Sequence, residues 1–522
     1  ICSISASSVA QQIKTPLMGW ASWNNYRVNI NENIIKKQAD ALVASGLSAV
    51  GFKYVNIDDG YFNQRYADGT FRLDSIKFPN GMKAVADYIH QKGLRAGFYS
   101  EAGANTCGSI WDAQQGGIGG GLYGHDEQDI HLFMKTWGFD YLKVDFCGGL
   151  QQKLDERTRY TAVKQAIDRT GRTDINFNVC RWQFPGTWVT KIANSWRISQ
   201  DITPDWKSIV SIIRKNTFLA AYADQGHYND MDMLEVGRGL TNEEDKSHFS
   251  LWCILSSPLI LGNDLTNLSQ QTKDILTNTE VIAVNQDTTG LQARLIADNG
   301  KGLQIWAKNL NGRISKERAV VLFNAGETTE DMTVSWRMLH LKGNIKVRDL
   351  WAHRDLSALS DTAFTAKVPP HGVVMLKVTG AENILQQTFE AEYSYMNNYS
   401  LLESTVVKPH QADVARDTSC SGGAKAVSLG NNAGNWIEFR DVFANKSGIY
   451  RLTITYLCAD DRDIAVQVNG KESLVRKLNA GSLTKAGNRT VAVRLTKGRN
   501  TIRLSNAKGW MPDIDKINID VK

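Results

Sequence analysis

Two acidic residues stand beside basic residues at the ends of short apolar runs, and these types together could perform nucleophilic and acid–base chemistry. Asp145 ends a run that contains Lys143, and Asp201 follows a run that contains Arg197. Residues two apart on a strand share a face, so Lys143 and Asp145 can both point into one pocket. There the ammonium group would keep the carboxylate ionised and able to attack.

Aromatic and acidic residues also end two other runs. Trp23 stands at the end of the first run, and the paired Asp58 and Asp59 follow the second. Two carboxyl groups on opposite sides of a pocket, with Trp and paired Asp nearby, are typical of glycoside hydrolysis, in which one attacks and the other protonates the leaving oxygen. The alternative is that each acid lies on the surface or caps the next helix. The occurrence of the whole set at run ends favours the functional interpretation.

The elements that must position these residues alternate between β-rich runs and helical segments. Two segments, Asn33–Val43 and Gly81–Ile89, place apolar residues at the i, i+3, i+4 spacing of amphipathic helices. Eight runs within ~250 residues predict a (β/α)₈ barrel, in which functional side chains follow the carboxyl ends of strands. A doubly wound sheet would alternate similarly, but no GxGxxG motif follows the first run. The eight runs are Leu17–Trp23, Tyr54–Ile57, Ala96–Tyr99, Tyr141–Val144, Asn176–Val179, Trp196–Ile198, Gly226–Asn229 and Pro258–Leu261.

The 522 residues are too many for one small module, and the pattern changes twice along the chain. We expect a barrel at 12–284, an antiparallel β-sandwich at 285–379 and a second β-sandwich of jelly-roll type at 388–522. In the third region, Asn469-Gly470 stands between two alternating runs and predicts a hairpin turn.

Composition narrows the possible partners and the compartment. The net charge is only +6 and no run of Lys or Arg occurs, so nucleic acid is not an expected partner. The sequence contains no stretch of 18 or more apolar residues, so it predicts no membrane-spanning helix. The seven cysteines include no CxxC pair, which disfavours a zinc cluster. The chain begins at Ile1 without Met, which favours a mature secreted or periplasmic protein.

Five strings resemble the signatures of glycoside hydrolase family twenty-seven, the α-galactosidase and α-N-acetylgalactosaminidase family. They occur in the family's order, and the resemblance covers roughly residues 12–378. The strings are Met18–Asn24, Tyr54–Asp59, Tyr141–Asp145, Arg197–Ile202 and Asn229–Leu234.

The resemblance implies an enzyme that releases terminal α-D-galactosyl residues with retention, through a covalent glycosyl-enzyme and without a cofactor for catalysis. Asp145 would be the nucleophile and Asp201 the acid/base. It also implies a disulfide between Cys107 and Cys147, which favours an oxidising compartment. The sugar would be bound by Trp23, Asp58, Asp59, Lys143, Trp182 and Arg197.

Three positions depart from the family pattern. Gly60 stands where many relatives have Cys, and Met231 replaces the usual Pro. Glu101 stands where α-galactosidases usually have Asp. Its extra methylene could push the carboxylate toward the sugar's exocyclic carbon and favour β-L-arabinopyranose, as in a β-L-arabinopyranosidase branch of the family. The alternative is that Glu101 only hydrogen-bonds a neighbour.

Other functions remain open at this point. Cys180 and Trp182 are bulky and would crowd a 2-acetamido group, so a free 2-hydroxyl is expected on the sugar, whether in a galactosyl- or an arabinosyl-containing glycan. A non-catalytic carbohydrate-binding protein is the alternative from a different class. Retention of both carboxylates, Lys143 and Arg197 argues against it.

The C-terminal region resembles carbohydrate-binding modules of families six and thirty-five. The resemblance rests on Phe389–Tyr393 and Trp510–Ile517. It implies that Glu390, Glu392 and Asp515 hold a structural calcium ion, since oxygen ligands suit that ion. Trp510 would either stack on a glycan or fill the core.

Overall fold

The computed structural model describes residues 14–357, 360–399 and 411–521. The predicted start of the barrel at residue 12, Cys2 and part of the predicted third region lie outside the described residues. The chain divides into two compact units, and each is described by itself. The first contains the chain up to Trp182, Trp188–Ile212 and Gln225–Gly290, and the second contains Gln183–Thr187, Ile213–Asp224 and the chain from Leu291 onward.

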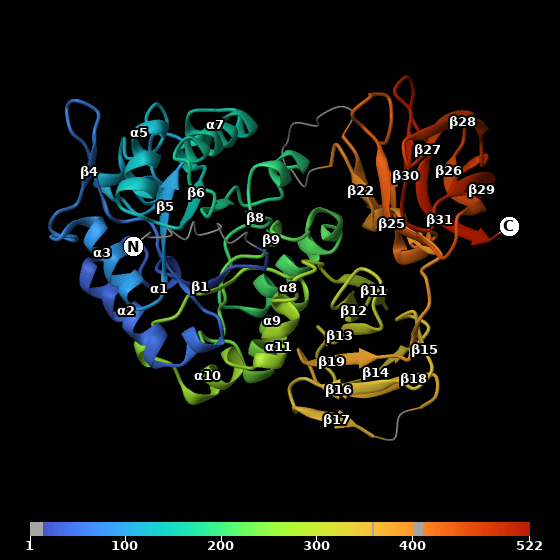
Figure 1. Ribbon diagram of the computed structural model, residues 1–522, viewed down its shortest axis with the longest axis horizontal. Helices are drawn as coiled ribbons and strands as arrows, with labels where there is room; N and C mark the ends of the chain where they lie inside the picture. Colours follow the sequence, from blue (N-terminus) through green and yellow to red (C-terminus); the bar gives the residue numbers. More distant parts are fainter. Residues whose placement is uncertain (1–13, 358–359, 400–410, 522) are drawn as a thin grey trace, which may run out of the picture. The chain divides into compact units, whose positions relative to one another are not determined.

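A parallel sheet of eight strands forms the centre of the first unit (Figure 1). Its order is β10-β1-β2-β5-β6-β7-β8-β9, and a parallel bridge between Leu234 and Leu261 joins the two edges. The closed sheet confirms the predicted barrel and excludes the open doubly wound alternative. The strands are β1 (Met18–Ala21), β2 (Tyr54–Ile57), β5 (Arg95–Glu101), β6 (Tyr141–Asp145), β7 (Asn176–Val179), β8 (Ser195–Arg197), β9 (Tyr228–Asp230) and β10 (Leu259–Leu261).

Helices connect most of these strands, and local capping fixes where several of them begin. Asn31 accepts the Ile34 N–H at 3.0 Å and starts α2, and Thr241 forms a capping box with Glu244 at the start of α9. Both predicted amphipathic helices are present, as α2 and α3. The helices include α2 (Glu32–Ala44), α3 (Gly81–Gln91), α5 (Asp126–Ile130), α7 (Glu156–Arg169), α8 (Trp206–Asn216), α9 (Asn242–Ile254), α10 (Gln270–Leu276) and α11 (Thr279–Asn285).

Two excursions at the carboxyl ends of the strands were not anticipated from the sequence. A hairpin of β3 (Phe62–Arg65) and β4 (Phe71–Leu73) follows β2. Two short helices, α4 (Cys107–Trp111) and α6 (Cys147–Gln151), follow β5 and β6. Because these segments leave the barrel where functional side chains gather, they supply part of the site.

The second unit contains an antiparallel sheet of order β11-β12-β13-β19-β16-β17. Its apolar face packs with the β14–β18 pair around a core that includes Val320, Val334 and Leu376. The strands are β11 (Arg294–Asp298), β12 (Leu303–Asn309), β13 (Glu317–Asn324), β14 (Glu330–Ser335), β16 (Lys346–Asp349), β17 (Arg354–Leu356), β18 (Ala363–Val368) and β19 (Val373–Thr379).

Two further sheets follow, of order β23-β24-β31-β26-β29, with β21 also paired to β31, and β22-β25-β30-β27-β28. The predicted hairpin joins β27 and β28 through Asn469 and Gly470, whose φ angles of 47° and 88° suit a type I′ turn. Among the described residues, no helix is long and apolar enough to cross a membrane. The strands are β21 (Thr388–Glu390), β22 (Tyr395–Met396), β23 (Asp413–Arg416), β24 (Ala424–Val427), β25 (Ile437–Ala444), β26 (Gly448–Cys458), β27 (Arg462–Val468), β28 (Lys471–Leu478), β29 (Ser482–Leu495), β30 (Gly498–Ser505) and β31 (Asp513–Val521).

Candidate active site

The carboxyl end of β6 places Lys143 between two carboxylates. Its Nζ lies 3.0 Å from Asp58 Oδ2, at the end of β2, and 3.8 Å from Asp145 Oδ1. Asp58 and Asp145 are 4% and 6% exposed, so solvent screens this charge cluster little. Burial opposes the charge on Lys143, but the two carboxylates outweigh it and raise its pKa well above the usual range. Lys143 is therefore a permanent cation beside Asp145, as its spacing predicted.

Asp145 is balanced between the charged and the neutral form. Burial raises the pKa of Asp145 to about 7, Lys143 opposes this, and the charge of Asp58 adds to it. Asp145 Oδ1 is buried and accepts no hydrogen bond from the described residues. The free oxygen is consistent with a group that reacts rather than one that holds the fold together.

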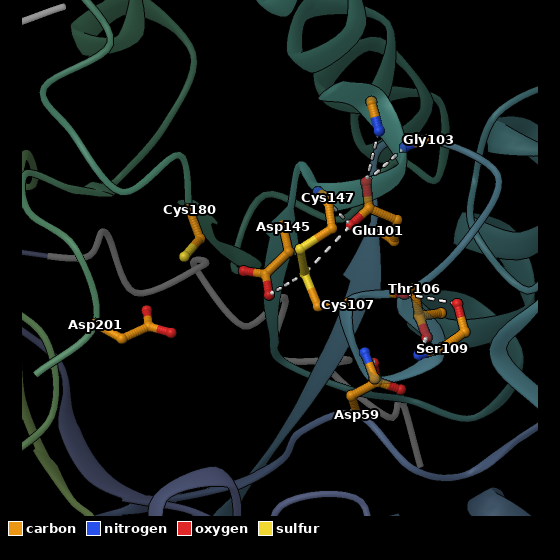
Figure 2. The surroundings of a disulfide bond; sticks show 12 residues. Asp59, Glu101, Gly103, Thr106, Cys107, Ser109, Asp145, Cys147, Cys180 and Asp201 are labelled. Atoms are coloured by element: carbon orange, nitrogen blue, oxygen red, sulfur yellow. Dashed lines mark hydrogen bonds between the residues drawn. A yellow bond between two sulfur atoms is a disulfide. The ribbon is translucent and has the colours of Figure 1, made fainter. Parts of the chain in front are cut away.

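A disulfide joins Cys107 and Cys147 directly beside Asp145 (Figure 2). Cys107 Sγ lies 3.3 Å from Asp145 Oδ2. A disulfide sulfur carries no proton, so this is a packing contact that limits where the carboxylate can turn. The disulfide implied by the family resemblance is confirmed.

Glu101 lies on the other side of the disulfide and is fully buried. Its carboxylate accepts three backbone N–H groups, from Gly103 at 2.8 Å, Cys147 at 2.9 Å and Gly149 at 3.2 Å. Burial raises the pKa of Glu101 to about 8, although these hydrogen bonds oppose the shift. Glu101 thus ties the end of β5 to the start of α6, as the hydrogen-bonding alternative expects, and its effect on the choice of sugar stays a prediction.

Arg197 holds the second carboxylate. Its Nη2 donates to Asp201 Oδ1 at 2.9 Å, and it also lies 2.8 Å from Asp232 Oδ2. The Asp201 side chain is 60% exposed, whereas Arg197 is almost fully buried. Burial tends to raise the pKa of Asp201, but Arg197, Lys143 and Arg27 outweigh it and lower that pKa.

The carboxylates of Asp145 and Asp201 point toward one another (Figure 2). They are close enough that the charge of Asp201 raises the pKa of Asp145. Arg197 in turn favours the ionised form of Asp201. The separation of roughly 5–6 Å expected for a retaining pair stays a prediction.

The two acids after β2 differ in their surroundings. Asp58 faces Lys143, whereas Asp59 accepts the Gly108 N–H at 2.7 Å and is fully buried. Burial raises the pKa of Asp59 to about 6. Gly60 follows with a φ of +122°, and a Cβ there would lie 2.6 Å from the Val28 carbonyl oxygen. A cysteine at this position would be strained, which explains the departure from the family pattern.

The predicted aromatic walls are both partly exposed. The guanidinium of Arg27 makes a cation–π contact with the Trp23 ring, and its Cζ lies 4.7 Å from the ring centroid. Arg27 is held in turn by Asp112 at 2.7 Å. Trp182 adopts a left-handed backbone with φ 61°, and its carbonyl accepts Gln200 Nε2 at 3.2 Å.

A cavity inside the barrel mouth brings together several predicted residues and some that the sequence analysis gave no role. Asp58, Lys143 and Arg197 line it, while Glu101, Asp145 and Asp201 are not among its lining residues. Three of the lining residues belong to the segment Asn229–Leu234, which matches a family string but whose side chains had no predicted role. Met231 donates its N–H to Ser257 Oγ at 3.0 Å, a bond that proline could not make. The lining residues without a predicted role include Tyr99, Asn178, Asp230, Asp232 and Met233.

Comparisons with known proteins agree with this geometry. A family model described as "Alpha galactosidase A" matches residues 15–287, and one described as "Alpha galactosidase C-terminal beta sandwich domain" matches residues 300–378. Alpha-galactosidase 2 of Arabidopsis thaliana is 42% identical over 372 residues, which cover 70% of this chain and 89% of the relative. Alpha-galactosidase A of Cellvibrio japonicus is 38% identical over 398 residues, 72% of this chain and 94% of the relative.

A solved structure gives the same result. The crystal structure of alpha-galactosidase I from Mortierella vinacea superimposes with a TM-score of 0.66 at 36% identity, covering 72% of this chain and all of the other. The first family model alone spans more than half of the 522 residues. The chain therefore belongs to the alpha-galactosidase family and is a glycoside hydrolase.

Proposed function

We propose that the protein is a retaining exo-glycosidase that removes terminal α-D-galactosyl residues from glycans, with Asp145 as nucleophile and Asp201 as acid/base. The observation that carries the proposal is that the two carboxylates face each other at the carboxyl ends of the barrel strands (Figure 2). Lys143 lies beside the first and Arg197 beside the second. The names of the relatives support the galactosyl substrate.

The reaction proceeds in two balanced steps. Asp145 attacks the anomeric carbon and the glycosidic bond breaks, while Asp201 gives its proton to the leaving oxygen. Asp201, now ionised, takes a proton from water, whose oxygen bonds to the anomeric carbon and releases Asp145. Asp58, Asp59, Lys143 and Arg197, together with the Trp23, Trp182 and Cys180 side chains, bind the sugar in this proposal.

Arg197 favours the ionised form of Asp201, whereas the first step needs a proton on Asp201. A sugar that enters the pocket lies between the carboxylates and brings hydroxyl groups to Lys143 and Arg197. Weakening the hold of Arg197 on Asp201 raises the proton affinity of Asp201, which produces the arrangement that the reaction needs.

Galactose is proposed over L-arabinopyranose because Glu101 is occupied by backbone N–H groups. We expect kcat/KM for p-nitrophenyl α-D-galactopyranoside to exceed that for the β-L-arabinopyranoside by at least about 10- to 200-fold, the range for one missing methylene group in a pocket. Steady-state kinetics on both substrates measures this ratio.

Glu101→Asp is the matched variant for that measurement. It should leave the ratio unchanged and lower the melting temperature, since a shorter side chain cannot reach all three N–H groups. A ratio that rises severalfold in Glu101→Asp would show that Glu101 narrows the sugar pocket. Hydrolysis of the arabinoside alone by the wild type would contradict the galactosyl assignment. Absence of any hydrolysis would favour the non-catalytic binding protein.

We also propose that the C-terminal module binds carbohydrate and holds a structural calcium ion. Glu392 is fully buried, and neither of its carboxylate oxygens accepts a hydrogen bond from the described residues. Glu390 accepts the Ser421 hydroxyl at 2.6 Å, and Asp515 accepts the Ser421 N–H at 2.9 Å. Unpaired buried oxygens among three acids fit a hard cation. Oxygens of all three acids do not lie within 4.8 Å of one another, so other ligands would complete the set.

Calcium is expected to raise the melting temperature by several degrees relative to chelator. Burial raises the pKa of Glu392 to about 9, above the unfolded value of about 4.3. The calcium-free protein therefore loses stability as pH rises between these values, and the calcium effect grows over the same range because ion and proton compete. Thermal unfolding at about pH 5 and pH 8 tests this.

Glu392→Gln should abolish the calcium response in that experiment. Glu438→Gln, in the same module, is the control, because Glu438 pairs with Arg440 and Arg503 instead. A wild-type melting temperature that does not change with calcium at either pH contradicts the calcium site.

A secreted or periplasmic location is proposed on the basis of the Cys107–Cys147 disulfide. Such bonds persist mainly in oxidising compartments.

A further inference from the structure

Asp232 is a buried carboxylate that holds two parts of the Asp201 surroundings at once. Its Oδ2 lies 2.8 Å from Arg197 Nη2 and accepts the Ile202 N–H at 2.7 Å. Ile202 directly follows Asp201 in the chain, so this hydrogen bond fixes the backbone that carries Asp201. The other oxygen accepts the Met233 N–H at 2.8 Å. Each carboxylate oxygen of Asp232 therefore holds at least one neighbouring group in place.

Asp201 and Asp232 share one amino group of Arg197. Nη2 lies 2.9 Å from Asp201 Oδ1 and 2.8 Å from Asp232 Oδ2. The same Nη2 also donates to the Ser199 carbonyl oxygen at 3.2 Å, while Arg197 Nε is buried and donates to none of the described residues. If Asp232 were neutral, the full attraction of the guanidinium would act on Asp201.

We propose that Asp232 is a positioning residue that divides the charge of Arg197, so that Asp201 can hold the proton needed for the first step. The inference rests on the assignment of Asp201 as acid/base in the proposed function. Asp232 lines the cavity at the barrel mouth, and in this proposal it acts through Arg197 and through the Ile202 N–H.

Other charged groups also affect the pKa values of Asp201 and Asp232. Burial raises the pKa of Asp232 to about 6, while Arg197 opposes it, so Asp232 is mainly ionised at neutral pH. Asp230, in β9, raises that pKa further. The groups that act on Asp201 besides Arg197 are Lys143, Arg27, Asp145 and Cys180.

The backbone at Asp232 makes a clean test possible. Its φ is +76°, a left-handed conformation that Asp tolerates and Gly prefers. Asp232→Asn therefore removes the charge and keeps the shape, while Asp232→Gly removes the carboxylate and relieves the backbone. The second variant keeps the test available if the first fails to fold.

The experiment measures kcat/KM against pH for melibiose and for 2,4-dinitrophenyl α-galactoside. Both variants should move the alkaline limb to lower pH by about half a unit or more. The rate on melibiose, which needs a proton on its leaving oxygen, should fall at least about tenfold further than the rate on the dinitrophenyl substrate, whose leaving group needs none. A purely structural role would lower both rates alike and leave the limb in place.

Asp129→Asn is the matched control. Asp129 is a fully buried carboxylate paired with Arg65 outside the cavity lining, so its loss should lower the melting temperature without moving the alkaline limb. The inference is overturned if both Asp232 variants keep the alkaline limb of the wild-type pH profile and the wild-type ratio of the rates on the two substrates. The proposed function would still stand. If Asp201→Ala shows no such difference between the two substrates, the assignment of Asp201 fails, and this inference fails with it.

Discussion

Replacing Asp145 by Asn is expected to lower kcat on an aryl α-galactoside by about 10⁴-fold while the protein stays folded. Asn has nearly the same shape but cannot form the glycosyl ester. Asp145 Oδ1 accepts no hydrogen bond from the described residues, and burial already disfavours its charge. Neutralising it should therefore leave the melting temperature unchanged or slightly higher. Steady-state kinetics and thermal unfolding of the same preparation measure both quantities.

A reaction with azide tests specifically whether Asp145 is the nucleophile. In Asp145→Gly, azide can enter the vacated space and displace the leaving group directly, which inverts the anomeric carbon and yields β-galactosyl azide. Asp140→Asn is the control, because Asp140 immediately precedes the other end of β6 and pairs with His90 and Arg172. It should lose stability and keep kcat. Residual activity near the wild-type level in Asp145→Asn would remove Asp145 as the nucleophile.

The second large effect is expected for Asp201→Ala. Without a general acid, kcat/KM for melibiose should fall by about 10²- to 10⁴-fold. The loss for 2,4-dinitrophenyl α-galactoside should be much smaller, because that leaving group departs without a proton. Azide should restore turnover and give α-galactosyl azide, since it attacks the covalent intermediate from the side that the leaving group left.

The control for this variant lies in the same loop. Asp205 is exposed and accepts the Ser208 N–H at 2.9 Å, so Asp205→Asn should leave both rates unchanged. Equal losses on the two substrates in Asp201→Ala, or formation of β-galactosyl azide, would be inconsistent with the role of acid/base.

The barrel strands, and the placing of acids such as Asp58 and Asp145 at strand ends, could be predicted because their signals are local. β2 and β6 are short apolar runs that end in carboxylates, and in a parallel barrel such ends meet at one face. The Asn469-Gly470 turn is predicted for the same reason, since its φ angles depend on those two residues alone.

Glu101 and Asp232 show what local patterns cannot supply. The carboxylate of Glu101 bonds to backbone N–H groups of Cys147 and Gly149, more than forty residues away, and no spacing in the sequence reports that contact. Asp232 lies beyond the end of β9 in a left-handed turn, and its partners Arg197 and Ile202 are brought to it by the neighbouring strand. Both roles depend on tertiary contacts rather than on residue type.

The contact between Cys107 and Asp145 has a practical consequence for handling the protein. Dithiothreitol in a purification buffer would turn the two sulfurs into thiols, and each thiol can donate a proton where the bonded sulfur could not. A thiol that donates to Asp145 would stabilise its carboxylate and make it a weaker attacking group. Preparations from a host with a reducing cytosol should therefore be assayed for free thiols before their rates are compared with those of oxidised protein.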